Sequence, residues 1–137
     1  ADVGGRTGSM VKGARDLATA IAGHGVPVYA YRFTYVADSA VDTAPPDGAA
    51  HATEIPFFFN TQAVKYEGAT TERDNAVGRT ASAYVVNFAK TGDPNGTGLP
   101  DWPRYDRSVD VIMDFNREGN AVAGKDPWAA EMDAASR

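Results

Sequence analysis

His51 is the residue of this sequence best placed to carry out acid–base chemistry. It lies within residues 48–59, whose sequence is GAAHATEIPFFF. An imidazole takes up and releases a proton near neutral pH, because its ordinary pKa is about 6.5. Small residues beside His51 let the main chain pass close to a neighbouring group, and Glu54 is near enough in sequence to support the histidine loop. The segment therefore predicts one part of an acid–base site whose other parts are missing.

The remaining polar motifs do not predict a second site. His24 follows a predicted helix and is interpreted as a solvated residue near the helix C-terminus, where the helix dipole favours a cation. Asp93 and Asn95 lie in a tight turn that lacks the further acids and the distal glutamate of a calcium-binding loop. The sequence has no cysteine, no glycine-rich phosphate loop and no HExxH pair. We therefore expect neither a metal nor a cofactor.

Length and charge narrow the class of protein. A chain of 137 residues fits one domain and can bury a sizeable core. The net charge is −5, and the 13 basic residues are scattered, which argues against a nucleic-acid partner. No apolar run approaches the roughly 18 residues of a membrane span, so none is predicted. The sequence does not indicate a cellular compartment.

The first half of the chain predicts a helix, a strand and a loop that together position His51. Residues 10–21 have apolar side chains at helical spacing, with Ser9 as the N-cap and Gly23-His24-Gly25 as the stop. Residues 26–36 are apolar on nearly both faces, which is typical of a strand inside a helix-covered sheet. Residues 37–47 form a loop at the carboxyl end of that strand. Because α/β sheets place their sites there, the order predicts His51 at the functional edge.

The second half predicts two helices and one further strand. After an irregular stretch over residues 60–70, Thr71 and Asp74 form a capping box for a helix that ends at Gly92. Residues 109–115 alternate between apolar and acidic side chains, as in an edge strand. A last short helix is predicted to open at Asp126-Pro127. Two strands are too few for a closed domain, so the chain is interpreted as the end of a larger α/β sheet.

Four segments in sequence resemble the type B carboxylesterases, the family of cholinesterases and para-nitrobenzyl esterases. Besides residues 48–59, they are VYAYRF at residues 28–33, NFAKTGDPN at residues 87–95 and WPRY at residues 102–105. The resemblance covers residues 26–128. It implies an α/β-hydrolase fold, of which residues 1–137 would form a C-terminal portion with a buried strand, histidine loop, helix, edge strand and helix.

The resemblance also implies a serine hydrolase in which the nucleophile, the acid and the histidine follow in that order. His51 aligns with the catalytic histidine and would act as general base and then as general acid. Glu54 aligns with a companion glutamate, which is expected to hold the loop and not to serve as the triad acid.

The chain departs from the family pattern because no serine lies in a G-x-S-x-G motif; the serines are Ser9, Ser39, Ser82, Ser108 and Ser136. We expect the nucleophile and the triad acid upstream, so that the chain corresponds to about the last quarter of a carboxylesterase and is inactive alone. Its substrate would be a small carboxylic ester of unspecified identity. The alternatives are a noncatalytic cholinesterase-like interaction module and an unrelated small α/β domain. Because apolar faces need cover, the chain is expected to self-associate.

Overall fold

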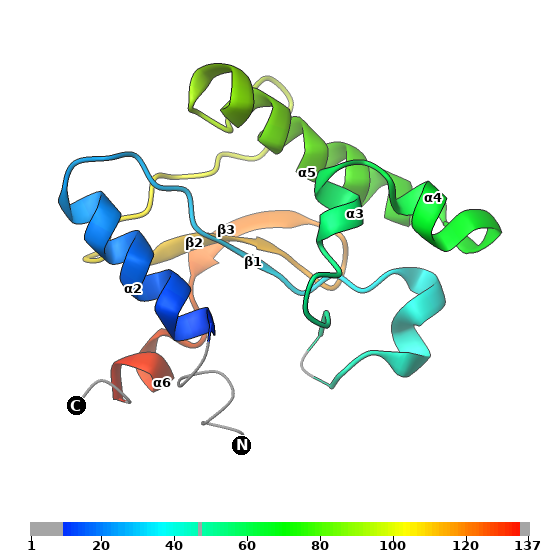
Figure 1. Ribbon diagram of the computed structural model, residues 1–137, viewed down its shortest axis with the longest axis horizontal. Coiled ribbons are helices and arrows are strands. Elements are labelled where there is room, and N and C mark those ends of the chain that lie inside the picture. The colour runs from blue at the N-terminus through cyan, green and yellow to red at the C-terminus, as the bar shows by residue number, and fades with distance from the viewer. Residues whose placement is uncertain (1–9, 47, 135–137) are drawn as a thin grey trace. The chain divides into compact units, whose positions relative to one another are not determined.

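The chain forms helices and one small sheet in a computed structural model that describes residues 10–46 and 48–134 (Figure 1). The three strands form one sheet in the order β1-β2-β3. The chain divides into two units, the first containing described residues 10–30, 103–113 and 123–134, and the second containing residues 31–102 and 114–122 apart from residue 47. The elements are α2 (Met10–Gly23), β1 (Tyr31–Phe33), the 3-10 helix η1 (Asp38–Thr43), α3 (Ile55–Phe58), α4 (Gln62–Tyr66), the 3-10 helix η2 (Glu67–Ala69), α5 (Glu72–Thr91), β2 (Val111–Phe115), β3 (Ala121–Lys125) and α6 (Ala129–Ala134).

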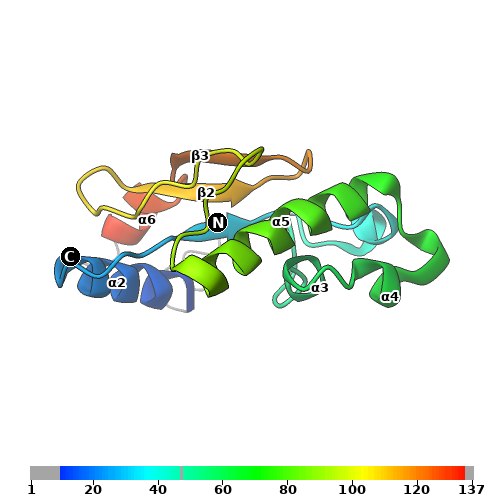
Figure 2. The ribbon, with the colours of Figure 1, turned by 90° about the horizontal axis from the view of Figure 1, so that it is seen from above.

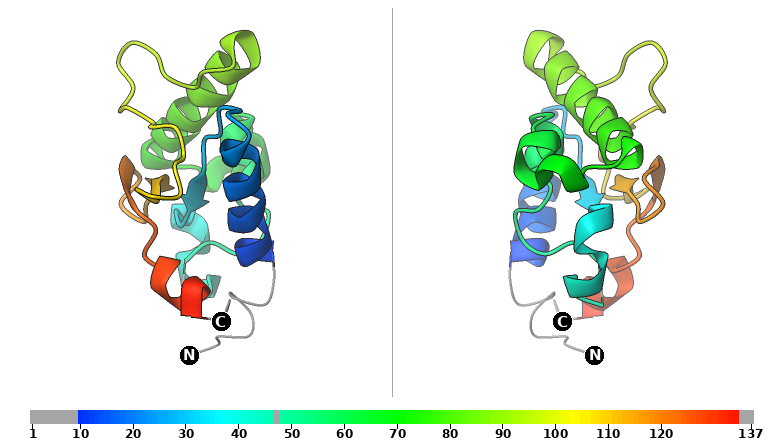
Figure 3. Two further views of the ribbon diagram at one scale, coloured as in Figure 1. Left: turned by 90° about the vertical axis from the view of Figure 1, so that its left-hand side faces the viewer. Right: turned by 90° about the vertical axis from the view of Figure 1, so that its right-hand side faces the viewer.

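Helix α2 of the first unit confirms the prediction from apolar spacing. It ends at Gly23, and the next turn closes through Gly25, whose φ is 78° and whose N–H donates to Ala22 O at 2.9 Å. Helices α2 and α6 lie next to each other (Figure 3), because Arg15 of α2 donates a 2.7 Å hydrogen bond to Asp133 of α6. The predicted N-cap, Ser9, lies outside the described residues.

Helix α5 is the longest element of the second unit, and its ends are where the caps predict them. Thr71 Oγ1 accepts from Asp74 N at 3.2 Å, and an Asp74 carboxylate oxygen accepts from Thr71 N at 2.9 Å, which completes the capping box. Gly92 closes the other end with φ 77° and donates to Phe88 O at 2.7 Å. Helices α3 and α4 lie alongside α5 (Figure 2).

Aromatic side chains fill the core of the second unit. Tyr84, Trp102 and Phe115 are buried and meet edge to face, with ring centroids 5.2 to 5.9 Å apart. Asn95 fixes the tryptophan loop: its Oδ1 accepts from Trp102 N at 2.6 Å, and its Nδ2 donates to Trp102 O at 2.9 Å. Residues 95–102 are therefore held on the core of the second unit by side-chain packing and by these two hydrogen bonds.

The strand predictions were wrong in extent and in order. The strand predicted over residues 26–36 is only the three residues of β1, an outer strand of the described sheet. Residues 109–115 were predicted as an edge strand, but β2 lies in the middle because an unpredicted strand, β3, pairs with it. The turn between them closes through Asn116 N donating to Asn120 O at 2.9 Å, with Gly119 at φ 84°. The β3 sequence, AVAGK, lacks the alternation typical of strands, which is why the pattern missed it.

The segments predicted as irregular contain short helices. The loop of residues 37–47 holds η1, with Asp47 outside the described residues, and residues 60–70 hold α4 and η2. The last helix, α6, begins at Ala129 and not at Pro127, because Asp126 caps a preceding turn by accepting from Trp128 N at 2.9 Å.

Candidate functional site

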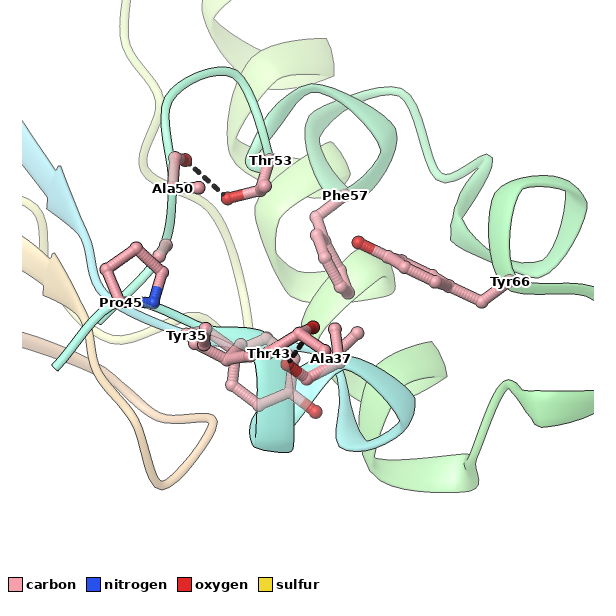
Figure 4. Close-up of a pocket in the computed structure, with 12 residues that line it drawn as sticks. Tyr35, Ala37, Thr43, Pro45, Ala50, Thr53, Phe57 and Tyr66 are labelled. Carbon is pink, nitrogen blue, oxygen red and sulfur yellow. Dashed lines mark hydrogen bonds between the residues drawn. The ribbon is translucent and has the colours of Figure 1, made fainter.

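His51 lies exposed on a β-turn that spans Ala50 to Thr53. Ala50 O accepts two hydrogen bonds from Thr53, one from its N–H at 3.3 Å and one from its hydroxyl at 2.7 Å (Figure 4). Ala52, directly after the histidine, has φ 65°, the left-handed conformation that usually requires glycine. The turn thus presents the His51 imidazole outward from its second position.

Both ends of this turn are fixed by the second unit. On the upstream side, Gly48 is buried with φ 117°, and a Cβ placed on it would lie 3.2 Å from Thr34 O and 3.3 Å from Thr34 Cβ. On the downstream side, Glu54 O accepts from Phe57 N and Phe58 N at 3.0 Å each, which starts α3. The Phe57 ring is buried and packs edge-on against Tyr35, with centroids 5.3 Å apart. A close backbone approach and a buried aromatic pair therefore hold the histidine turn in place.

A buried polar network supports that aromatic pair. The Tyr35 hydroxyl donates to Asp74 at 2.7 Å, and Asp38 N donates to the same carboxylate oxygen at 3.2 Å. Burial, followed by the hydrogen bond and the charge of Asp74, raises the pKa of Tyr35. Hydrogen bonds from Thr71 Oγ1, at 2.5 Å, and from Arg73 lower the pKa of Asp38. The sequence analysis missed this network because its members come from the segment after β1, from η1 and from the start of α5.

Glu54 is half-buried, and its carboxylate acts on Tyr31. Burial first, and then the negative charge of Glu54, raise the pKa of the Tyr31 hydroxyl. Among the described residues, the Glu54 side chain makes no hydrogen bond to the start of α3 and none to His51. In the structure, Glu54 supports the loop through its main-chain carbonyl, which accepts hydrogen bonds at the N-cap of α3.

The other candidate residues belong to other segments of the chain. His24 is exposed and follows α2, as predicted, with its N–H donating to Ile21 O at 3.1 Å. Ser39, Ser82 and Ser108 are the described serines, and the Ser108 hydroxyl donates to Asp106 at 2.6 Å. The described part of the chain brings none of them into a hydrogen bond with His51.

In residues 10–46 and 48–134, no three side chains of the types that bind metal ions gather into a group. No helix in those ranges has the length and the apolar character needed to cross a membrane.

Known proteins resemble this chain over most of its length. A profile of the carboxylesterase family matches residues 7–132. Carboxylesterase 5A of Canis lupus familiaris is 41% identical over 99 residues, which are 67% of this chain and 17% of the relative. The medium-chain fatty acyl-CoA hydrolase precursor of Anas platyrhynchos is 42% identical over 83 residues, which are 60% of this chain and 14% of the relative. The chain thus spans less than a fifth of these curated relatives.

A solved structure extends the likeness to the fold. The carboxylesterase EST55 of Geobacillus stearothermophilus at pH 6.2 superimposes with a TM-score of 0.72 and is 31% identical, over 93% of this chain and 26% of that enzyme. This match confirms the expected fold class, a portion of an α/β-hydrolase fold. Together with the family profile, it confirms the resemblance drawn from the four sequence segments. The chain belongs to the carboxylesterase family, in its type B branch.

Proposed function

We propose that this chain is the C-terminal, histidine-bearing part of a serine carboxylesterase, and that His51 is its general base. The observation that carries the proposal is the presentation of His51: the imidazole is exposed on a turn fixed at both ends. Membership of the carboxylesterase family supports ester hydrolysis as the reaction class. The substrate would be a carboxylic ester small enough to reach this turn.

In the proposed reaction His51 carries a proton in both directions. Its imidazole takes the proton from a serine hydroxyl as that oxygen attacks the ester carbonyl, and the carbonyl electron pair moves to oxygen. When the carbon–oxygen bond to the leaving alcohol breaks, the imidazolium returns the proton to that alcohol. Water repeats the two steps on the acyl-enzyme and releases the acid. The serine and the triad acid come from an upstream part of the protein, while Glu54 holds the loop.

The chain of 137 residues is expected to be inactive alone, because a triad without its serine loses most of its rate enhancement. Hydrolysis of a short-chain nitrophenyl ester tests this on the chain and on a longer polypeptide that includes the serine and the acid. In the longer protein, we expect His51→Gln to lower kcat by roughly 10⁴-fold or more. The matched control is His24→Gln, which changes an exposed histidine outside the turn and should leave kcat unchanged. Equal activity of the two variants would refute the role of His51.

Exposed apolar side chains support a second proposal, that the chain alone self-associates. Around α3 and α4, Ile55 is 50% exposed, Phe59 70% and Val64 77%. Such a surface favours association with another chain, as in a noncatalytic interaction module. Light scattering after size-exclusion chromatography should show oligomers that Phe59→Ser and Val64→Ser reduce. A monodisperse monomer would rule out self-association, and a longer polypeptide that associates but does not hydrolyse esters would favour the interaction module.

A further inference from the structure

A cavity of about 130 Å³ lies beside the histidine turn, within the second unit (Figure 4). Its walls come from the segment after β1, from η1 and the residues after it, from the histidine turn, and from α3 and α4. His51 is not part of the lining, so the cavity is separate from the imidazole of the proposed active site. The lining residues include Ala37, Ala40, Ala49, Ala50, Phe57 and Tyr66.

The size and the chemistry of the walls define what can fill this cavity. The walls are mainly alanine, proline, valine and aromatic side chains. An apolar cavity of about 150 Å³ is large enough to bind benzene. A single six-membered ring therefore matches this space, with Phe57 available for ring contact on one wall.

The hydroxyl groups around the cavity are not equivalent. Thr43 Oγ1 already donates to Ala40 O at 3.1 Å, Thr53 Oγ1 donates to Ala50 O at 2.7 Å, and the Tyr35 hydroxyl donates to Asp74. The Tyr66 hydroxyl forms no hydrogen bond with any described residue, and its ring packs 6.2 Å from that of Phe57.

The Tyr66 hydroxyl is directed from its ring toward Phe57, another residue of the lining (Figure 4). Burial, and then the charge of Asp74, raise the pKa of Tyr66, so its hydroxyl keeps its proton at neutral pH and can donate it. One donor beside an apolar space of this size suits a ligand with one polar atom on a ring.

We propose that this cavity binds a small monocyclic aromatic molecule that carries a single hydroxyl group, and that Tyr66 is its hydrogen-bond partner. The ring occupies the apolar space beside Phe57, and the ligand oxygen accepts from Tyr66. The inference rests on the cavity alone and does not depend on the proposed role of His51.

Phenol is the probe, titrated into the isotope-labelled chain of 137 residues and followed by its amide NMR signals. We expect saturable shifts at Ala37, Ala40, Ala49 and Ala50, with a dissociation constant on the order of 1 mM. Tyr66→Phe should weaken phenol binding roughly two- to tenfold, the effect of one hydrogen bond, and should not weaken the binding of benzene. Phenol shifts that do not saturate, or that centre on the exposed residues Ile55 and Val64, would overturn the proposal.

Filling the cavity provides the second test, with a control from the same 3-10 helix. Ala40→Leu places a larger side chain in the space and should abolish the binding of both phenol and benzene. Ser39→Leu introduces the same side chain at an exposed neighbour outside the lining, and both ligands should still bind. Unchanged phenol affinity in a folded Ala40→Leu protein would contradict the site. If Ala40→Leu does not fold, unchanged phenol affinity in Tyr66→Phe would contradict it as well.

Discussion

The Tyr35 hydroxyl donates a 2.7 Å hydrogen bond to the Asp74 carboxylate, and both side chains are completely buried. The same carboxylate also accepts from the main-chain N–H groups of Asp38, at 3.2 Å, and of Thr71, at 2.9 Å. A buried carboxylate is tolerated only where such donors replace water. The Asp74 carboxylate thus joins the segment after β1, η1 and the start of α5, and these parts of the chain support the histidine turn through Tyr35 and Phe57.

Removing the Tyr35 hydroxyl is expected to destabilise the chain. Tyr35→Phe should lower the free energy of unfolding by about 2 kcal/mol, because hydrogen bonds to charged groups contribute about 1.5–3 kcal/mol. Asp74→Ala should cost more than about 3 kcal/mol, since it leaves several buried donors without an acceptor. Urea denaturation measures both changes. Tyr66→Phe is the matched control and should change the unfolding free energy by less than about 0.5 kcal/mol; equal effects of the two Tyr→Phe variants would contradict the role of Asp74.

Ala52 occupies a left-handed conformation beside the candidate catalytic histidine, with φ 65°. The conformation costs an alanine roughly 1–2 kcal/mol, whereas glycine adopts it freely at the expense of about 0.4–1 kcal/mol of chain entropy. Ala52→Gly should therefore raise the free energy of unfolding by about 0.5–1 kcal/mol.

The same substitution inside a helix is the control. Ala83→Gly in α5 should lower the free energy of unfolding by roughly 1 kcal/mol, because glycine is a poor helix former. Thermal unfolding of both variants measures the contrast, and the idea fails if Ala52→Gly also destabilises the chain.

The helices could be predicted from sequence because their signals are local. The ends of α5 are set by the Thr71–Asp74 capping box and by Gly92, and each signal involves only a few neighbouring residues. The sheet could not be predicted in this way, since the place of β2 depends on β3, whose sequence has little strand character. Residues 26–36 look like one long apolar strand, yet only Tyr31–Phe33 pair as a strand.

The same contrast between local and long-range signals applies to the site. The small residues around His51 predicted that the main chain passes close to a neighbouring group, and a Cβ on Gly48 would lie 3.2 Å from Thr34 O. Tyr35 was interpreted only as a strand residue and Asp74 only as a helix cap. Their sequence separation is 39 residues, so nothing in the local pattern could indicate the hydrogen bond between them.

We expect Tyr84 to make the stability of the chain sensitive to alkaline pH. Burial, together with the charge of Asp101, raises the pKa of Tyr84 to about 12, against about 10 in an unfolded chain. Because the Tyr84 pKa is higher in the folded than in the unfolded chain, its contribution to the free energy of unfolding is fully present below pH 10. This contribution is lost as the pH rises toward 12. Tyr84→Phe should cost about 1 kcal/mol at pH 7, because the 2.6 Å hydrogen bond to Pro100 O is lost.

The pH dependence separates ionisation of Tyr84 from simple loss of packing. Urea denaturation at several pH values between 10 and 12 should show a shallower loss of stability for Tyr84→Phe than for the parent chain. Parallel curves would mean that ionisation of Tyr84 does not contribute to alkaline unfolding.

Arg15 connects α2 to two acids of the first unit. Its Nη2 lies 2.5 Å from Asp110 and its Nη1 lies 2.7 Å from Asp133, with the Arg15 and Asp110 side chains only 9% and 12% exposed. Burial alone would lower the pKa of Arg15, but the hydrogen bonds to the two acids raise it. Asp110 also accepts from the Tyr105 hydroxyl at 3.0 Å, so its charge is held in a mostly buried site.

Arg15→Met should therefore lower the free energy of unfolding by about 3 kcal/mol, because breaking a buried pair leaves the Asp110 carboxylate without its main partner. Arg107, whose Nη1 lies 3.7 Å from an Asp110 carboxylate oxygen, should replace only part of the lost interaction with Arg15. The matched control is Arg79→Met, whose ion pair with Glu72 is exposed on both sides and should contribute less than about 1 kcal/mol. Urea denaturation compares the two variants. A double variant that combines Arg15→Met with Asp110→Asn should recover part of the loss, because it removes the unpaired charge; no recovery would mean that packing of the Arg15 stem, and not charge, holds α2 in the first unit.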